Sequence, residues 1–365
     1  MDDRYGRLFE LPATLAQLGH EVHGISLSYR TRPEKCYQWD DINRLQWSSF
    51  NINPLSVWLY TKKVGEILKS FQPDIIWASS DVFHLLIGLI TKKIAKRPLV
   101  IDLYDNYESF AMTRLPGMRS ILRTACRKAD GITVVSKSLD EHIKKTYLTK
   151  TPAIIIGNGV SPDVFFPSSR VLSRKLLNLP IDAYLIGTAG SLTKDRGIED
   201  LFLAFERLAT HNPKLWLVYA GRTDKIAKSF KNPRIINLGN LPHKKVSILF
   251  SALDVGVICN RESDFGSFCF PQKLYEMVAC NLCFIAARTA GIADILSEHP
   301  DYLYTPGDDI QLAQRIQQHL PFPRPAPLKS MTWKQEAIRL EEWFQSVLST
   351  PPPHPEREKN HAHSN

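Results

Sequence analysis

The stretch "LIGTAGSLTKDRGIEDLFLAF", residues 185 to 205, contains the pattern that decides the fold. It opens with a short apolar run, turns at Gly190-Ser191, and continues from Arg196-Gly197 with apolar residues at helical spacing. An apolar run that leads directly into a helix predicts a buried strand of a parallel sheet and its crossover helix. Backbone amides at such a helix start, with the basic side chains of Arg196 and Lys194 close by, predict a phosphate site.

Apolar runs of the same kind recur along the chain and alternate with helical patterns. They lie at residues 21–27, 74–80, 98–104, 131–136 and 153–158 in the first half, and at 185–191, 215–221, 234–239, 254–260 and 283–287 in the second. This alternation predicts an α/β protein with two doubly wound domains, one after the other in the sequence. Asn158-Gly159, Pro162 and Pro167 break the periodicity between the two sets. We therefore expect domains at residues 1–165 and 166–325.

The two ends of the chain do not follow the alternating sequence pattern of the middle. The sequence begins on a helical pattern, whereas a doubly wound domain usually opens with a buried strand, so the first strand is missing or another segment supplies it. Residues 326–350 predict a docking helix that Thr332 caps, because Trp333 and four further apolar residues share one face: Ala337, Leu340, Phe344 and Val347. The tail, residues 351–365, has nothing to bury and is expected to be disordered.

Composition favours an intracellular protein. With 365 residues, 44% of them hydrophobic, the chain can form two cores. Its six cysteines are scattered, which is typical of a reducing cytoplasm and not of a secreted disulfide scaffold. The most apolar run, residues 82–90, is far shorter than the roughly 20 residues that span a bilayer, and the start does not resemble a signal peptide. We expect a cytoplasmic protein.

The net charge of +9 is uneven. Residues 60–150 hold 16 Lys and Arg against 9 Asp and Glu, and residues 166–325 hold 19 against 15. A basic face attracts the phosphates of nucleic acid, anionic lipid or a phosphorylated substrate. An ordinary solvated lysine-rich surface explains the charge equally well.

An ordered set of motifs resembles glycosyltransferase family 4, and the resemblance implies the GT-B fold, in which two Rossmann-like, doubly wound domains face each other across a cleft. The set is "RLFELPATLAQLGHEV", "ADGITVVSKSL", "IIIGNGVSPDVFFP", "GSLTKDRGIEDLFLAF", "LVYAGR", "LFSALDVGVICN" and "KLYEMVACNLCFIAARTAG", between residue 7 and about residue 320. The resemblance implies a retaining, hexosyltransferase-like enzyme that moves a sugar from a nucleotide sugar to a glycan or lipid-linked acceptor in cell-surface polysaccharide or glycolipid biosynthesis. It implies a donor site in the C-terminal domain, an acceptor in the N-terminal one, and neither a metal nor a redox cofactor.

The resemblance also implies roles for residues of the second domain. Glu276, expected in the first turn of its helix at the edge of the sheet, is implied to hold the nucleotide ribose; a helix-capping carboxylate is the alternative. Lys273 resembles the Pro-x-Lys-x-x-Glu variant of some members. The family often has a sugar-contacting glutamate eight positions before Glu276, but position 268 is Phe, so Glu262 or Asp264 would have to substitute.

The diphosphate is expected at the helix start, with Gly190, Ser191, Lys194 and Arg196, together with Arg222 of the "LVYAGR" motif. Many relatives have Gly-Arg and Lys-Gly where this chain has Gly190-Ser191 and Arg196-Gly197, so one basic residue is lost and one is replaced.

The catalytic candidates are Tyr104 and Asp105, which end an apolar run where the family frequently shows His-Asp. A tyrosine can donate a hydrogen bond to a sugar hydroxyl, but it is a poor base near neutral pH because its ordinary pKa is about 10.

Two other features have competing interpretations. Cys280 and Cys283 suggest metal or redox chemistry, yet the resemblance places both in a structural turn, and the sequence has no second Cys-x-x-Cys motif to complete a zinc site. Arg119, Arg123 and Arg127 recur at helical spacing. This stripe predicts docking onto an anionic membrane or a phosphorylated lipid acceptor at the inner face of the membrane, or else a solvated helix face.

Three other functions are alternatives to a glycosyltransferase. Phe268, Tyr104 and the missing strand also fit a non-catalytic binding or regulatory protein with this fold. A dinucleotide-dependent dehydrogenase requires a Gly-x-Gly-x-x-Gly turn, which the sequence lacks. Nucleic-acid binding is not expected because no recognised module accompanies the basic charge.

Overall fold

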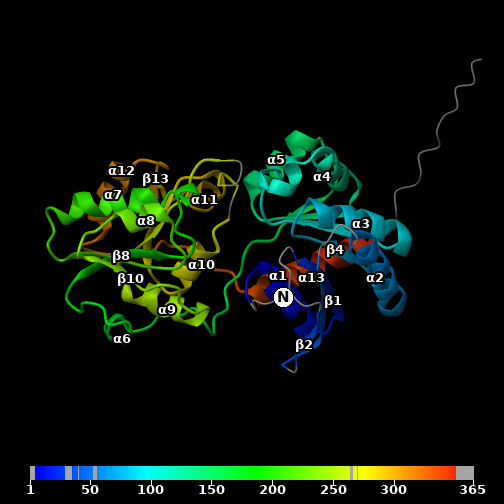
Figure 1. Ribbon diagram of the computed structural model, residues 1–365, viewed down its shortest axis with the longest axis horizontal. Helices are drawn as coiled ribbons and strands as arrows, with labels where there is room; N and C mark the ends of the chain where they lie inside the picture. Colours follow the sequence, from blue (N-terminus) through cyan, green and yellow to red (C-terminus); the bar gives the residue numbers. More distant parts are fainter. Residues whose placement is uncertain are drawn as a thin grey trace, which may run out of the picture.

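The computed structural model has two α/β lobes, which Figure 1 shows side by side. It describes residues 5–28, 35–39, 41–51, 56–263, 266–268 and 270–350. None of the described helices is long and apolar enough to cross a membrane.

The C-terminal lobe is built on one sheet of six parallel strands in the order β10-β9-β8-β11-β12-β13. Its strands are β8 (Tyr184–Ala189), β9 (Leu215–Ala220), β10 (Ile235–Asn237), β11 (Val255–Ile258), β12 (Cys283–Ala287) and β13 (Leu303–Tyr304). Every residue of β11 and β12 is buried, which explains their unbroken apolar sequence. The strand order reverses direction between β8 and β11, and ligands bind open α/β sheets at such a point.

Helices cover both faces of this sheet. They are α6 (Arg170–Leu176), α7 (Ile198–Ala209), α8 (Lys225–Ser229), α9 (His243–Ala252), α10 (Gln272–Ala279), α11 (Ala290–Ile295) and α12 (Asp309–His319), with 3-10 turns η3 (Lys194–Arg196) and η4 (Pro300–Tyr302). The expected succession of strand, turn and helix over residues 185–205 is confirmed, because β8 ends at Ala189 and α7 begins at Ile198.

The N-terminal lobe contains two sheets. One has four parallel strands in the order β4-β5-β6-β7: β4 (Ile76–Ala78), β5 (Leu99–Leu103), β6 (Gly131–Val134) and β7 (Ala153–Ile155). The other has the order β1-β3-β2, from β1 (Val22–Ser28), β2 (Lys35–Trp39) and β3 (Ile42–Asn51). The expected strands in the first half are present, whereas β2, β3 and, in the other lobe, β13 were not expected from the sequence. The antiparallel pairing of β2 with β3 departs from the all-parallel prediction.

The two N-terminal sheets lie next to each other, although no hydrogen-bonded ladder joins them in the described residues. Helix α3 (Val82–Ala95) packs on both, since Phe83 contributes to a cluster with Leu27 of β1 while Leu85 contributes to one with Ile101 of β5. On another side, Val22 of β1 lies in the same cluster as residues of β4 and β7. The opening strand that a doubly wound domain usually has is therefore not found among these residues.

The remaining helices of this lobe are α1 (Arg7–Gln17), α2 (Ser56–Phe71), α4 (Met118–Lys128) and α5 (Lys137–Tyr147), with 3-10 turns η1 (Tyr107–Ser109) and η2 (Ala111–Arg114). The chain crosses back to them at its end: α13 (Trp333–Ser349) packs against α1 in the N-terminal lobe (Figure 1). The predicted Thr332 cap is present as a capping box with Gln335.

A buried ion pair fixes the start of α1 against the sheet. The Arg7 guanidinium donates to both carboxylate oxygens of Asp102, at 2.6 and 3.1 Å, and to the carbonyls of Ile156 and Gly157. Ser79 and Thr133 also donate to Asp102, so the buried charges are paired and hydrogen-bonded. This network joins α1 to the ends of β5 and β7.

Candidate functional site

The expected phosphate-binding residues lie at the carboxyl end of β8. Gly190 directly follows the strand with a φ of 116°, a conformation that favours glycine. A Cβ atom built on Gly190 would lie 3.5 Å from Nζ of Lys273, so the ammonium group of α10 lies against this turn. The structure thus brings together Gly190 and Lys273, which are 83 residues apart in the numbering.

The start of α7 completes this edge of the site. Gly197 precedes Ile198 with a φ of 69°, and the Arg196 side chain is half-buried beside it. Ser191, Lys194 and Arg222 are exposed in the neighbouring loops. These loops are joined, because the Leu192 N–H donates to the Arg222 carbonyl at 2.8 Å and the Lys194 N–H donates to Asp224 at 2.7 Å.

Arg261 is a basic residue near this edge that the sequence reasoning missed. It follows β11, and a Cβ atom on Gly197 would lie 3.2 Å from its Cζ. Its Nη1 donates to buried Asp200 in the first turn of α7 at 2.5 Å, while the side chain keeps 28% of its surface exposed. Its position just beyond a central strand, at the edge where ligands bind, is the signal that could have identified it.

Asp105 faces this group from the N-terminal lobe. Its side chain is buried, and burial raises the pKa of Asp105 to about 7, while the Asn106 N–H and then the positive charge of Arg196 act in the opposite direction. The Arg196 charge acts on the Asp105 carboxyl across the two lobes, so the two predicted residues lie within electrostatic range of each other. An aspartate with a pKa near neutrality can hold or release a proton at physiological pH.

Tyr104 is placed differently from the expectation that its hydroxyl is offered to a sugar. The phenol donates a hydrogen bond to the Ser80 carbonyl at 3.2 Å, and its ring packs edge-on against Tyr107. Burial, followed by the charges of nearby Asp105 and Asp102, raises the pKa of Tyr104 well above its ordinary value. The side chain is therefore a neutral phenol whose proton is engaged by the backbone.

Glu276 also requires a correction. It lies in the second turn of α10, not the first, and its residue is only 7% exposed, whereas an exposed carboxylate was expected. One oxygen, Oε1, accepts from Nε2 of Gln272 at 3.2 Å and lies 3.3 Å from Nε2 of His243. The carboxylate is thus held by two neighbouring side chains.

Position 268 is a contact between the lobes. Phe268 packs against the N-terminal core, and its ring lies 4.6 Å from that of His142 on α5. Phe270 is buried in the same core. Of the two proposed substitutes for the missing carboxylate, Glu262 is exposed, and Asp264 lies outside the described residues.

Comparison with known proteins decides the class of enzyme. The model of Glycosyltransferase Family 4 matches residues 7–164, and the model of Glycosyl transferases group 1 matches residues 183–321. Both lobes match glycosyltransferase models, so this chain is a glycosyltransferase. The two matched segments correspond to the two lobes, so the GT-B fold expected from the motifs is confirmed.

Two relatives of this glycosyltransferase cover most of its length. It is 23% identical over 323 residues to N-acetyl-alpha-D-glucosaminyl L-malate synthase of Bacillus anthracis, covering 85% of this chain and 82% of the relative. It is 24% identical over 274 residues to TuaC of Bacillus subtilis (strain 168), a protein assigned as a teichuronic acid biosynthesis glycosyltransferase, covering 75% of this chain and 67% of the relative.

Solved structures share the fold of the glycosyltransferase. A sucrose-phosphate synthase from Thermosynechococcus elongatus superposes with a TM-score of 0.75 at 17% identity, covering 93% of this chain and 92% of that one. HepE of Anabaena in complex with UDP superposes with a TM-score of 0.65 at 20% identity, covering 83% and 86%.

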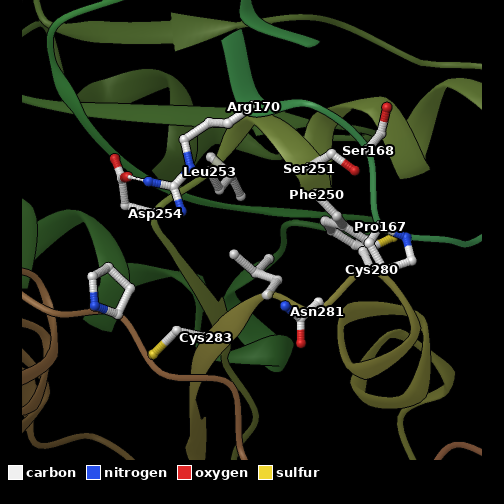
Figure 2. Close-up of a pocket in the computed structure, with 12 residues that line it drawn as sticks. Pro167, Ser168, Arg170, Phe250, Ser251, Leu253, Asp254, Cys280, Asn281 and Cys283 are labelled. Carbon is white, nitrogen blue, oxygen red and sulfur yellow. Dashed lines mark ion pairs between the residues drawn. The ribbon is translucent and has the colours of Figure 1, made fainter. Parts of the chain in front are cut away.

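The two cysteines of the family's structural turn do not converge in this glycosyltransferase. They line a pocket at the amino end of β12, opposite the candidate site, and Figure 2 shows their sulfur atoms on different sides of it. Sγ of Cys280 lies 3.9 Å from the Ser247 carbonyl, whereas Sγ of Cys283 lies 3.7 Å from Nδ1 of His319. Burial raises the pKa of both thiols to about 12, so each is a protonated thiol at neutral pH.

The arginine stripe lies on the outer face of α4. Arg119, Arg123 and Arg127 are exposed, while Leu122, Ala125 and Cys126 are buried, as the spacing predicts. Arg127 is partly committed to the fold, since its Nε donates to the Tyr147 carbonyl at 2.7 Å. Leu148, which directly follows Tyr147 in the sequence, is 73% exposed, so an apolar side chain borders the basic stripe.

Proposed function

We propose that this glycosyltransferase transfers a hexose-type sugar, with retention of configuration, from a nucleotide sugar to a glycan or lipid-linked acceptor in cell-surface polysaccharide or glycolipid biosynthesis. The observation that carries the proposal is the approach of Lys273 to Gly190 at the carboxyl end of β8, with Arg196 before the next helix and within electrostatic range of Asp105. Cations beside a glycine turn and a helix start suit a diphosphate. The names of both relatives support a glycosyl donor. The assignment of TuaC to teichuronic acid biosynthesis supports a glycan acceptor, whereas the other relative is named for L-malate, a small molecule.

Each candidate residue then has a role. Lys273 and Arg196, with Lys194 and Arg222 at the rim, neutralise the diphosphate, and the amides near Ser191 and Gly190 approach it closely. Lys273 lies against the turn that contains Ser191, where many relatives have arginine, and supplies the missing charge. Glu276 holds the ribose. Asp105 contacts the transferred sugar. Tyr104, the residue before it, is held in place by the hydrogen bond from its hydroxyl to the Ser80 carbonyl.

We further propose that the reaction needs no metal ion, because the cations above provide the charge that a metal would supply to the leaving diphosphate. The donor belongs to the lobe of residues 166–325 and the acceptor to the lobe of residues 1–165. Nucleic acid is not a partner of this site.

A thermal-shift screen with UDP, GDP, ADP and their sugars tests the donor proposal. A nucleotide at about 100 times its dissociation constant stabilises the native state by about 2.7 kcal/mol. We expect one nucleotide family to raise the melting temperature with EDTA present. Flat curves across the panel would contradict the proposal and favour a non-catalytic protein.

The basic stripe suggests where the acceptor is met. Arg119, Arg123 and Arg127 beside exposed Leu148 suit docking onto the anionic inner face of the membrane, where each such charge contributes about 1 kcal/mol. Changing all three arginines to glutamine should weaken vesicle binding roughly 100-fold. Co-sedimentation with phosphatidylglycerol vesicles at low and high salt measures it. The matched control changes three exposed lysines of the other lobe, Lys225, Lys228 and Lys231, to glutamine. Equal losses of vesicle binding in both variants would contradict a docking role and show that the stripe acts only as ordinary surface charge.

A further inference from the structure

We infer that His243 is a positioning residue that aims the Glu276 carboxylate at the vicinal hydroxyls of the nucleotide ribose. The inference rests on the proposed nucleotide-sugar site and identifies what orients its ribose-binding group. His243 is the first residue of α9 and lies 33 residues before Glu276, so no sequence motif connects the two.

The hydrogen bonds of Glu276 are distributed unevenly over its two oxygens. His243 Nε2 and Gln272 Nε2 both contact Oε1, at 3.3 and 3.2 Å. Within the described part of the chain, no hydrogen bond to Oε2 is found. A carboxylate oxygen has two lone pairs, so Oε2 can accept from both hydroxyls of a ribose diol while Oε1 is held by the protein.

The imidazole ring is itself held on two sides. Tyr5 stacks on it with ring centres 4.7 Å apart and planes 17° from parallel, and Phe165 meets it edge-on at 5.0 Å. The side chain of His243 keeps 25% of its surface exposed, so the ring borders the site without being sealed in the core. Two aromatic contacts fix the ring plane, and the ring plane fixes the direction of Nε2.

The protonation of the ring follows from these contacts. Glu276 Oε1 can only accept, so the hydrogen bond requires the proton on Nε2 of His243. Loss of this donor would leave Gln272 as the one remaining side chain that holds Oε1 in the described residues. Gln272 reaches it from the same helix, one turn away, and cannot restrain the carboxylate from the side of α9.

Phenylalanine at position 243 separates the two properties of the histidine. His243→Phe keeps a ring between Tyr5 and Phe165 but removes the donor, whereas His243→Gln offers an amide donor without the ring. Glu276→Gln tests the ribose role itself. His211→Phe, at an exposed position beyond α7, is the control for adding a phenylalanine.

The measurement is the affinity of each variant for UDP and GDP and for their 2′-deoxy forms, by calorimetry. We expect the wild type to prefer its ribonucleotide about tenfold or more, as charged hydrogen bonds imply. His243→Phe should lose most of that preference with unchanged affinity for the deoxy form, and His243→Gln should recover part of it. A purely structural role would lower both affinities together.

The outcomes distinguish the ribose-binding role of Glu276 from the positioning role of His243. If Glu276→Gln loses the ribose preference but His243→Phe retains it, the positioning role is refuted while the nucleotide site stands. If Glu276→Gln retains the preference, the ribose role proposed above fails, and the inference fails with it. If His243→Phe does not fold, the affinities of His243→Gln and Gln272→Met decide between the two roles. The first variant alters one donor to Oε1 of Glu276, and the second removes the other.

Discussion

Binding of a nucleoside diphosphate beside Arg196 should make Asp105 take up a proton. The positive charge of Arg196 lowers the pKa of Asp105, whereas burial raises it, with a result of about 7. A bound diphosphate would engage the arginine and add negative charge near the carboxylate. Both effects favour the protonated form of Asp105.

The size of the effect follows from the titration of the free protein. With a pKa of about 7, roughly half of the Asp105 carboxyl groups carry a proton at pH 7 and about a tenth do at pH 8. The uptake per nucleotide therefore has a ceiling of about 0.5 proton at pH 7 and about 0.9 at pH 8. At pH 5.5 the group is almost fully protonated beforehand, so it contributes almost nothing.

Calorimetric titrations in buffers of different ionisation enthalpy measure the number of protons taken up. The nucleotide's own phosphate also titrates, so the quantity of interest is the difference between the wild type and Asp105→Asn. We expect a difference that grows from pH 5.5 to pH 8. Identical proton uptake by the two proteins at pH 8 would refute the proposed coupling between Asp105 and the diphosphate.

Three further predictions concern single features of the molecule. Burial raises the pKa of Asp105 from an unfolded value of about 4 to about 7, so folding favours the protonated acid. The stability that this contributes is fully present below about pH 4 and is lost as pH rises through about 7. Asp105→Asn should therefore reduce the fall in the free energy of unfolding by up to about 1.3 kcal/mol per pH unit between pH 5 and 6.5, measured by urea unfolding. Parallel slopes for both proteins would contradict this. Lys273→Met should weaken binding of a nucleoside diphosphate by roughly 1.5 to 3 kcal/mol and leave the corresponding nucleoside unaffected; an equal loss for the nucleoside would assign the lysine to the fold. Changing both Cys280 and Cys283 to serine should leave transfer activity largely unchanged, and stoichiometric zinc in the purified wild type, by elemental analysis, would overturn the proposal that no metal is needed.

The sequence predicts the parts of the fold that depend on local pattern. The central strands of the C-terminal sheet, β8, β9, β11 and β12, are almost entirely buried and mostly apolar, so their positions can be read directly from the chain. The start of α7 is equally visible, because Gly197 marks a conformation that other residues rarely adopt. The pairing of β2 with β3 is not visible in this way, since the half-polar sequence of β3 alternates irregularly.

The site was predictable as a set of residues but not as a set of contacts. Lys273 and Glu276 were identified from their motif, yet the Glu276 carboxylate contacts His243, whose ring stacks on Tyr5 of the other lobe. The engagement of the Tyr104 hydroxyl depends in the same way on the Ser80 carbonyl. Such contacts join residues that are distant in sequence, and no local periodicity encodes them.

The two departures from the family pattern have a common physical consequence. Phe268 replaces a carboxylate that would contact the sugar, and in this structure it packs on His142 of the other lobe. Tyr104 replaces a histidine, and its hydroxyl is engaged by the backbone. Each change leaves an aromatic side chain that is engaged in packing or with the backbone, so we propose that recognition of the sugar falls to the remaining polar side chain of this group, Asp105. Because Asp105 is an acid that titrates near neutrality, we expect sugar selection in this enzyme to depend on pH more strongly than in relatives that keep the carboxylate.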